Sequence, residues 1–205
     1  MTDSRWVCLD VGETLVDEER WWRELAERSG LQPHVVWAAL GVTIERGEEH
    51  DALWSHLGID RPDEWWHSLT YSLDDLYPDA LECLARVQAL GLLVGVVGNQ
   101  TEALEQWARG AVLPAEVISS SASLGVRKPD PRFFECVVEL AGCRPEETAY
   151  VGDRVDNDVL PAAAAGLVAI HVRRGPWGRL QATPPEAALG VDDLASLPEA
   201  LASLE

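Results

Sequence analysis

The sequence predicts an α/β fold, a doubly wound parallel sheet, with a small all-helical domain inserted near its N-terminus. Two observations indicate this fold. Short apolar segments rich in Val, Ile, Leu or Ala alternate with helical patterns along most of the 205 residues. One long stretch, roughly residues 16–77, breaks this alternation and contains helical patterns only.

The strands of the sheet are expected where the short apolar segments stand. Most of these segments are apolar on both faces, which is typical of strands buried in a parallel sheet. They lie at about residues 6–9, 93–97, 115–119, 148–151 and 168–172.

The helices between the strands carry recognisable ends. Pro78 opens one helix, and Gly91 stands just past its end. Asp130 caps another, with Pro131 in the first turn and Gly142 after the last one. A proline at the start and a glycine after the end are typical helix boundaries.

The C-terminal third predicts three further segments. A helix is expected from about residue 157 to 165, and a closing helix from 194 to 204. Residues 173–190 are rich in Gly and Pro and are expected to form a loop.

The extra residues after the first strand predict a helical cap. A simple strand–helix–strand unit needs only about thirty residues, so we expect residues 1–15 and 78–205 to form the core and 16–77 the cap. Six of the nine tryptophans fall in the cap. They could form the core of a small helical bundle or a stacking pocket for an aromatic substrate. Four cap helices are expected, around Trp21, Trp22, Leu25 and Ala26; Val36, Ala39, Leu40 and Ile44; Leu53, Trp54 and Leu57; and Trp65, Trp66 and Leu69.

The composition excludes some classes of protein. The formal net charge of −19 argues against nucleic acid and anionic membranes as partners, since both require basic surfaces. The four cysteines show no CxxC pattern, which favours free thiols in a reducing cytosol. No signal segment or membrane-length apolar run is present, so we expect a cytoplasmic monomer or homodimer.

Two strand ends and one lysine carry the chemistry. Asp10 and Asp153 each follow an apolar strand, and Lys128 is the only lysine of the chain. The carboxyl ends of parallel strands meet at one edge of the sheet. Carboxylates there suit Mg²⁺, and the cation together with Lys128 would balance a phosphoryl group for attack by Asp10. Taken singly, Asp10 could also be a turn residue, Asp153 a helix cap and Lys128 a surface charge.

These residues stand in segments that resemble the four motifs of the haloacid dehalogenase superfamily, a family with a Rossmann-like core. The segments are residues 9–15, 96–99, 125–131 and 151–153 followed by Asp158. An insertion after the first motif is similar to the cap of the subclass that contains small-molecule phosphatases and 2-haloacid dehalogenases.

The resemblance implies roles for particular residues. Asp10 would be the nucleophile, and Lys128 would hold the nucleophile and the phosphoryl oxygens. Gly98 and Asn99 would lie at the substrate. The implied ligands of Mg²⁺ are Asp10, the backbone carbonyl of Gly12, Asp153 and Asp158, with Asn157 as an alternative support.

Two positions depart from the family pattern. Phosphatases of the family usually carry an aspartate two residues after the nucleophile, as the acid that protonates the leaving group, and this chain has Gly12 there. The leaving oxygen would then depart unprotonated or take a proton from water, the substrate or Glu13. The family's second motif usually has Ser or Thr before its Asn, where this chain has Gly98.

The favoured interpretation is a Mg²⁺-dependent phosphatase of a small organic phosphate monoester, acting through an aspartyl-phosphate. A 2-haloacid dehalogenase uses no metal, and the acidic cluster at Asp153 and Asp158 disfavours it. A phosphonoacetaldehyde hydrolase needs a cap lysine, which is absent, and a mutase needs the missing aspartate. A catalytically silent binding or regulatory module remains the alternative from another class. Around Gly47, one of Arg46, Glu48, Glu49 and His50 could reach the substrate.

Overall fold

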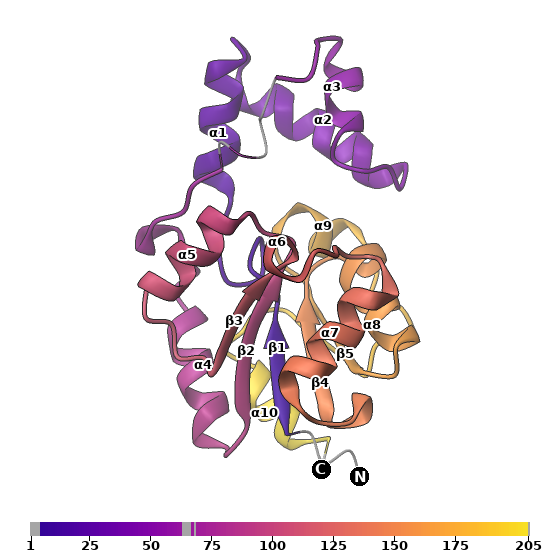
Figure 1. The fold of residues 1–205 in the computed structure, drawn as a ribbon. Coiled ribbons are helices and arrows are strands. Elements are labelled where there is room, and N and C mark those ends of the chain that lie inside the picture. Colours follow the sequence, from indigo (N-terminus) through magenta and orange to yellow (C-terminus); the bar gives the residue numbers. More distant parts are fainter. Residues whose placement is uncertain (1–4, 63–66, 68, 205) are drawn as a thin grey trace.

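The computed structural model of the protein describes residues 5–62, 67 and 69–204. Its described strands form a six-stranded parallel sheet in the order β3-β2-β1-β4-β5-β6 (Figure 1). The strands are β1 (Trp6–Leu9), β2 (Leu93–Gly98), β3 (Val117–Ser120), β4 (Thr148–Gly152), β5 (Val168–Val172) and β6 (Leu189–Val191). The predicted α/β fold is confirmed, and each predicted strand is present within about two residues.

The sheet register brings the chemistry-bearing loops together. β1 lies between β2 and β4, with Leu9 opposite both Val96 and Val151. The backbone N–H of Asp10 then donates to the carbonyl of Val151 at 2.9 Å. The loops after β1, β2 and β4 therefore leave the same edge of the sheet, as expected for parallel strands.

Helices cover both faces of the sheet because its strands are apolar on both sides. Val7 and Leu9 of β1 face a core built with α4, α5 and α10. Trp6 and Cys8 face the opposite way, into a core built with α7 and α8. These helices are α4 (Ala80–Ala89), α5 (Glu102–Gly110), α7 (Pro131–Ala141), α8 (Leu160–Ala164) and α10 (Leu197–Ala202).

The residues that cap α7 explain its predicted boundaries. The Asp130 side chain accepts the N–H of Arg132 at the start of α7, and Gly142 ends that helix at φ 63°. The helix expected from residue 157 begins as a π-helical turn, η3 (Val155–Val159), which continues into α8. Short turns of helix fill other connections: α6 (Ser121–Leu124), η1 (Leu73–Asp75) and η2 (Pro145–Glu147).

The loop predicted over residues 173–190 is wrong in part. It contains α9 (Gly175–Leu180) and the first residues of β6. Both elements are short, and two glycines and a proline stand within α9, so neither produces a periodic pattern in the sequence.

The segment 16–77, called the insertion below, forms a helical layer beyond the carboxyl ends of the strands (Figure 1). Its helices α1 (Glu19–Arg28), α2 (Pro33–Glu45) and α3 (Ala52–Leu57) match the first three predicted. The fourth, placed around Trp65 and Trp66, lies outside the described residues. Trp21 and Trp22 are only 1% and 2% exposed, so they serve as core of the layer.

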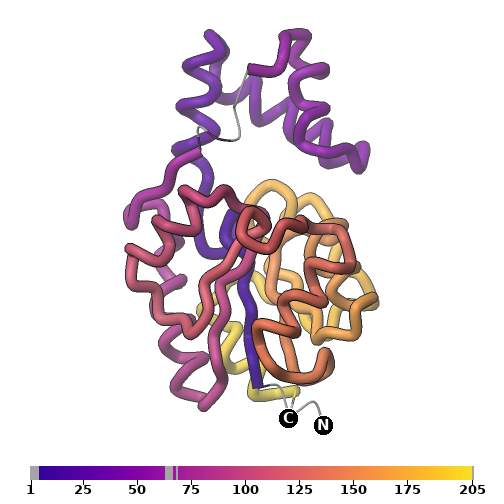
Figure 2. The backbone as a smooth tube through the Cα atoms, viewed as in Figure 1, coloured from indigo at the N-terminus to yellow at the C-terminus, as the bar shows by residue number. Residues whose placement is uncertain are grey.

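The chain enters and leaves the insertion at one place (Figure 2). Val16 forms isolated β-bridges with both Gly12 and Leu76. The N–H of Asp17 donates to the carbonyl of Asp75 at 2.8 Å. The two crossings between core and insertion therefore lie side by side.

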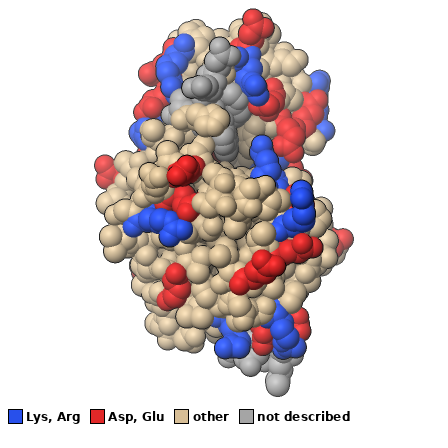
Figure 3. Space-filling model, viewed as in Figure 1, with Lys and Arg blue, Asp and Glu red and all other residues tan. Residues whose placement is uncertain are grey.

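The surface mixes charges of both signs, as the face drawn in Figure 3 shows. Among the described residues, no helix combines the length and apolar character that crossing a membrane requires. The four cysteines are free, with Cys8 and Cys83 buried and Cys136 and Cys143 half-buried.

Candidate active site

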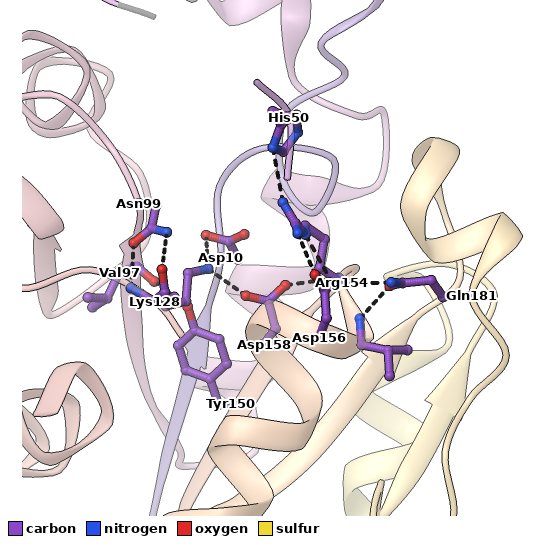
Figure 4. A network of polar contacts seen from close by, with 11 residues as sticks. Asp10, His50, Val97, Asn99, Lys128, Tyr150, Arg154, Asp156, Asp158 and Gln181 are labelled. Carbon is purple, nitrogen blue, oxygen red and sulfur yellow. Dashed lines mark hydrogen bonds and ion pairs between the residues drawn. The ribbon is translucent and has the colours of Figure 1, made fainter. Parts of the chain in front are cut away.

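The centre of the site is an ion-paired lysine between two carboxylates (Figure 4). Lys128 Nζ lies 2.8 Å from Asp10 Oδ1 and 2.5 Å from Asp158 Oδ1. The Lys128 side chain is fully buried, 0% exposed, although it carries a charge. A buried charge persists only where partners of opposite sign compensate for its lost hydration, and the two carboxylates do so here.

The environment keeps the lysine protonated. Burial lowers the pKa of Lys128, but the carboxylates of Asp10 and Asp158 outweigh it and raise that pKa above its ordinary value. The rings of Phe133 and Tyr150 lie 5.8 and 5.4 Å from Nζ and add favourable cation–π contacts. The ammonium is therefore a fixed positive charge beside Asp10.

Asp153 and Asp158 complete an acidic cluster with Asp10. One carboxylate oxygen of each lies within 4.8 Å of the other two. Asp158 already accepts Lys128 Nζ on Oδ1 and the Arg154 backbone N–H, at 2.9 Å, on Oδ2. Burial and then the neighbouring carboxylates raise the pKa of Asp153 well above its ordinary value, and burial raises that of Asp158 to about 6.

The cluster fits a divalent cation. Asp153 Oδ2 is buried and has no hydrogen-bond partner among the described residues. A buried carboxylate oxygen without a partner is costly, and a bound cation would remove that cost. An all-oxygen set of few carboxylates is the donor set that Mg²⁺ prefers. Asp10 and Asp153 are therefore the direct ligands that fit best, with Asp158 holding Lys128 beside them.

Gly98 is required by the closeness of β2 to Asp10. A Cβ atom at Gly98 would collide with Asp10 Oδ1, well inside contact distance. The Ser or Thr usual in the family would therefore not fit this arrangement. The next residue, Asn99, lines the cavity, and its side-chain amide is bonded to the backbone of Lys128.

The cavity above Asp10 leaves about 60 Å³ of free space. The core and the insertion both contribute to its wall, and a second cavity of about 570 Å³ adjoins it through Glu49, His50, Arg127 and Lys128. The wall of the first cavity consists of Asp10, Gly12, Glu13, Glu18, Glu49, His50, Asn99, Gln100, Arg127, Lys128, Asp153, Arg154, Asn157 and Trp177.

His50 and Arg154 join the insertion to the core at the cavity wall (Figure 4). The Arg154 guanidinium lies 3.0 Å from His50 Nδ1 and 3.8 Å from the ring centre of Trp177. The Trp22 ring also stacks on His50. Burial and the charge of Arg154 lower the pKa of His50 to about 3, so the imidazole is neutral and accepts the guanidinium N–H.

Two further carboxyl groups face the cavity. Tyr77 donates to Glu13 Oε2 at 2.6 Å, and Tyr71 donates to Glu18 Oε1 at 2.5 Å. Burial, followed by nearby carboxylates, raises the pKa of Glu13 to about 8. Burial raises the pKa of Glu18 to about 7, although the bond from Tyr71 opposes that shift.

Most of the site residues expected from sequence meet at one cavity, but Gly98 and Asp158 do not line it, and the cavity adds others. Asp10, Gly12, Asn99, Lys128 and Asp153 all line one cavity. Of the four residues around Gly47, Glu49 and His50 line the cavity. Glu18, Arg154 and Trp177 were missed: Glu18 stands between two other acidic residues, Arg154 stands beside a motif aspartate, and Trp177 lies in the region predicted as a loop.

Comparison with known proteins gives the same family as the motifs. A family model described as "Hydrolase: haloacid dehalogenase-like hydrolase" matches residues 5–166. A glyceraldehyde 3-phosphate phosphatase of Methanopyrus kandleri is 30% identical over 181 residues, 80% of this chain and 71% of that protein. A phosphoserine phosphatase of Thermus thermophilus is 36% identical over 124 residues, which is 58% of this chain and 48% of that one.

The fold is also shared with solved structures. An L-2-haloacid dehalogenase of Xanthobacter autotrophicus, with chloropropionic acid covalently bound, superposes with a TM-score of 0.69. The alignment covers 98% of this chain and all of that one at 19% identity. This likeness concerns the fold alone.

Proposed function

Because the chain belongs to the haloacid dehalogenase-like hydrolases, we propose that it is a Mg²⁺-dependent phosphatase of a small organic phosphate monoester. The observation that carries the proposal is the buried Lys128 between Asp10 and Asp158, beside Asp153 Oδ2, which has no hydrogen-bond partner in the described part of the chain. These groups supply a nucleophile, a fixed positive charge and an oxygen ligand within one cavity.

The proposed reaction has two steps at phosphorus. An oxygen of Asp10 attacks the phosphorus atom, the bond to the leaving oxygen breaks, and an aspartyl-phosphate forms. Water then attacks that phosphorus, and Asp10 is released as a carboxylate together with inorganic phosphate. Lys128 holds the attacking carboxylate and stabilises negative charge on the transferring oxygens.

The metal complements the lysine. Asp10, Asp153 and the Gly12 carbonyl would hold Mg²⁺, with Asp158 or Asn157 in support. When bound, the cation would balance negative charge on the phosphoryl group. Without added positive charge, the cluster of Asp10, Asp153 and Asp158 would repel an anionic substrate.

The cavities support a small substrate and a cap that moves. The space above Asp10, about 60 Å³, suits the phosphoryl group only. The adjoining cavity of about 570 Å³, between the insertion and the core, would take the organic part. Since His50 and Arg154 close the wall from both sides, we propose that the insertion is a cap that opens to admit the substrate. The protein would then act on a free metabolite rather than on a nucleic acid or a membrane.

A phosphate-release screen tests the proposal. The purified protein is incubated with a panel of phosphorylated metabolites and p-nitrophenyl phosphate, with Mg²⁺ or with EDTA. We expect phosphate release in Mg²⁺ only, and its loss in Asp10→Asn at unchanged folding. Asp193→Asn, a change of an exposed carboxylate, serves as the matched control. Absence of release from every ester would support a silent binding module instead.

A further inference from the structure

Gly12 leaves a space that another residue fills. A Cβ atom built on Gly12 would lie 2.5 Å from Glu18 Oε1 and 3.1 Å from Glu18 Cδ. A side chain at position 12 would therefore occupy the volume that the Glu18 carboxyl group occupies. The absence of a side chain at position 12 and the position of the Glu18 carboxyl group are therefore linked, because the carboxyl group lies where that side chain would be.

The Glu18 carboxyl group is held firmly in that place. Glu18 directly precedes α1 and is 7% exposed. Tyr71 donates its hydroxyl to Oε1 at 2.5 Å, and the Trp22 indole also hydrogen-bonds the carboxyl. Glu18 and both partners belong to the insertion, so these hydrogen bonds hold the carboxyl group within one unit. It lines the same cavity as Asp10 and Lys128.

We propose that Glu18 is the catalytic acid and base of this enzyme, acting from the position that Gly12 leaves open. The inference rests on the proposed phosphatase function and names the group that protonates the leaving oxygen. The position of the Glu18 carboxyl group supports this assignment. It lies beside Gly12 in the loop that carries Asp10, faces the cavity, and is held by its hydrogen bonds.

The proton balance of the two steps is complete. As the phosphorus–oxygen bond breaks, its electron pair stays on the leaving oxygen, which takes the proton of the Glu18 carboxyl and departs as an alcohol. Glu18 is then a carboxylate. It takes a proton from the water that attacks the aspartyl-phosphate, so that phosphate is released and Glu18 regains its acid form.

Glu13, which the sequence suggests first, occupies a different place. Tyr77 donates to its Oε2, and its Oε1 accepts the Glu18 backbone N–H at 3.4 Å. A Cβ atom at Gly175 would lie 2.5 Å from Glu13 Oε2. The Glu13 carboxyl therefore fills the space beside Gly175 in α9, whereas the Glu18 carboxyl fills the space beside Gly12.

The dependence of rate on the leaving group tests this assignment. Single-turnover cleavage is measured for alkyl phosphates and for p-nitrophenyl phosphate with the wild type, Glu18→Gln and Glu13→Gln. General acid catalysis contributes about 10²–10⁴-fold, and a poor leaving group needs it most. We expect Glu18→Gln to lose on the order of 10² or more on alkyl phosphates and far less on p-nitrophenyl phosphate. Glu13→Gln should change both rates by the same factor.

A rescue experiment covers the case in which a glutamine at position 18 disturbs the fold. Glu18→Ala opens the space, and adding Gly12→Asp should restore the alkyl rate selectively. Gly12→Asp with Glu18 in place should lower thermal stability, because the two side chains compete for one volume. Circular dichroism and melting temperature verify folding of every variant.

The outcomes separate the two proposals. If the wild type releases phosphate but Glu18→Gln slows alkyl and aryl esters equally, or if Glu13→Gln shows the selective loss, the role of Glu18 is wrong and the phosphatase proposal stands. A wild type that cleaves no phosphate ester contradicts the phosphatase function and the role of Glu18 together.

Discussion

Asn99 and Lys128 exchange two hydrogen bonds. The Lys128 backbone N–H donates to Asn99 Oδ1 at 2.8 Å, and the Asn99 amide donates to the Lys128 carbonyl at 3.0 Å. This pair joins the loop after β2 to the segment before α7. It fixes the backbone from which the ammonium of Lys128 reaches Asp10, so Asn99 acts through Lys128 as well as lining the cavity.

Replacing Asn99 by Ala should therefore weaken both stability and activity. Two hydrogen bonds of about 0.5–1.5 kcal/mol each are lost, which predicts a decrease of about 1–3 kcal/mol in the free energy of unfolding. Urea denaturation measures this decrease, and kcat should fall because Lys128 is less well held. Gln88→Ala, which removes a surface hydrogen bond to Glu116, is the control and should leave kcat unchanged. An Asn99→Ala enzyme with wild-type kcat would contradict the positioning role.

Replacing Lys128 by Ala should lower kcat by a factor on the order of 10² or more, because a preorganised charge at the transferring group is lost. Stability should fall as well, since Asp10 and Asp158 would face each other in a buried site without a cation. Lys128→Arg should rescue poorly, because a planar guanidinium is bulkier than the ammonium in a fully buried position. Equal rates for Lys128→Arg and the wild type would place the lysine outside the chemistry.

Replacing Asp153, a proposed ligand of the metal, should weaken Mg²⁺ binding. Isothermal titration calorimetry should detect one Mg²⁺ per wild-type chain, and Asp153→Asn should weaken binding by at least about tenfold. Asp156→Asn is a matched control, because the Asp156 side chain bonds to Arg154 and Gln181 instead. Activity should vanish with EDTA and return with Mg²⁺. Chloride release from 2-chloropropionate in EDTA would instead indicate a metal-independent dehalogenase.

Introducing the serine usual in the family, Gly98→Ser, should reduce activity rather than improve it. The new Cβ atom would push Asp10 out of position, and a displacement of about 1 Å in an active site can cost about 10²-fold in rate. Gly110→Ser is the control, since a Cβ atom at Gly110 meets no atom of the described residues within 4 Å. Single-turnover rates of the two variants decide the matter, and a gain in rate for Gly98→Ser would refute the steric explanation.

The core of the site was predictable because strand ends are predictable. Asp10 and Asp153 follow apolar runs long enough to identify as buried strands, and parallel strands bring their carboxyl ends to one edge. Lys128 was conspicuous as the only lysine. None of these inferences needed knowledge of how side chains pack.

The remaining site residues depend on packing that the sequence does not encode locally. Glu18 reaches Gly12 only because the turn from Val11 to Val16 folds back on itself. His50 meets Arg154 only because the insertion docks on the loop after β4. The first contact follows from one particular turn and the second from the tertiary arrangement, and neither has a periodic signal in the sequence.

Because Val16 pairs with Leu76, the insertion could be replaced as a unit. Its two ends leave the core at one point, so a different segment could be spliced in there without a change in the path of the sheet. Asp10, Lys128 and the rest of the acidic cluster would remain in the core, while Glu18, Tyr71 and His50 would be removed with the insertion. Under the proposed function, the groups that make the bond and the acid that protonates the leaving oxygen would thus be encoded in different parts of this chain, and exchange of one continuous segment could bring a new substrate.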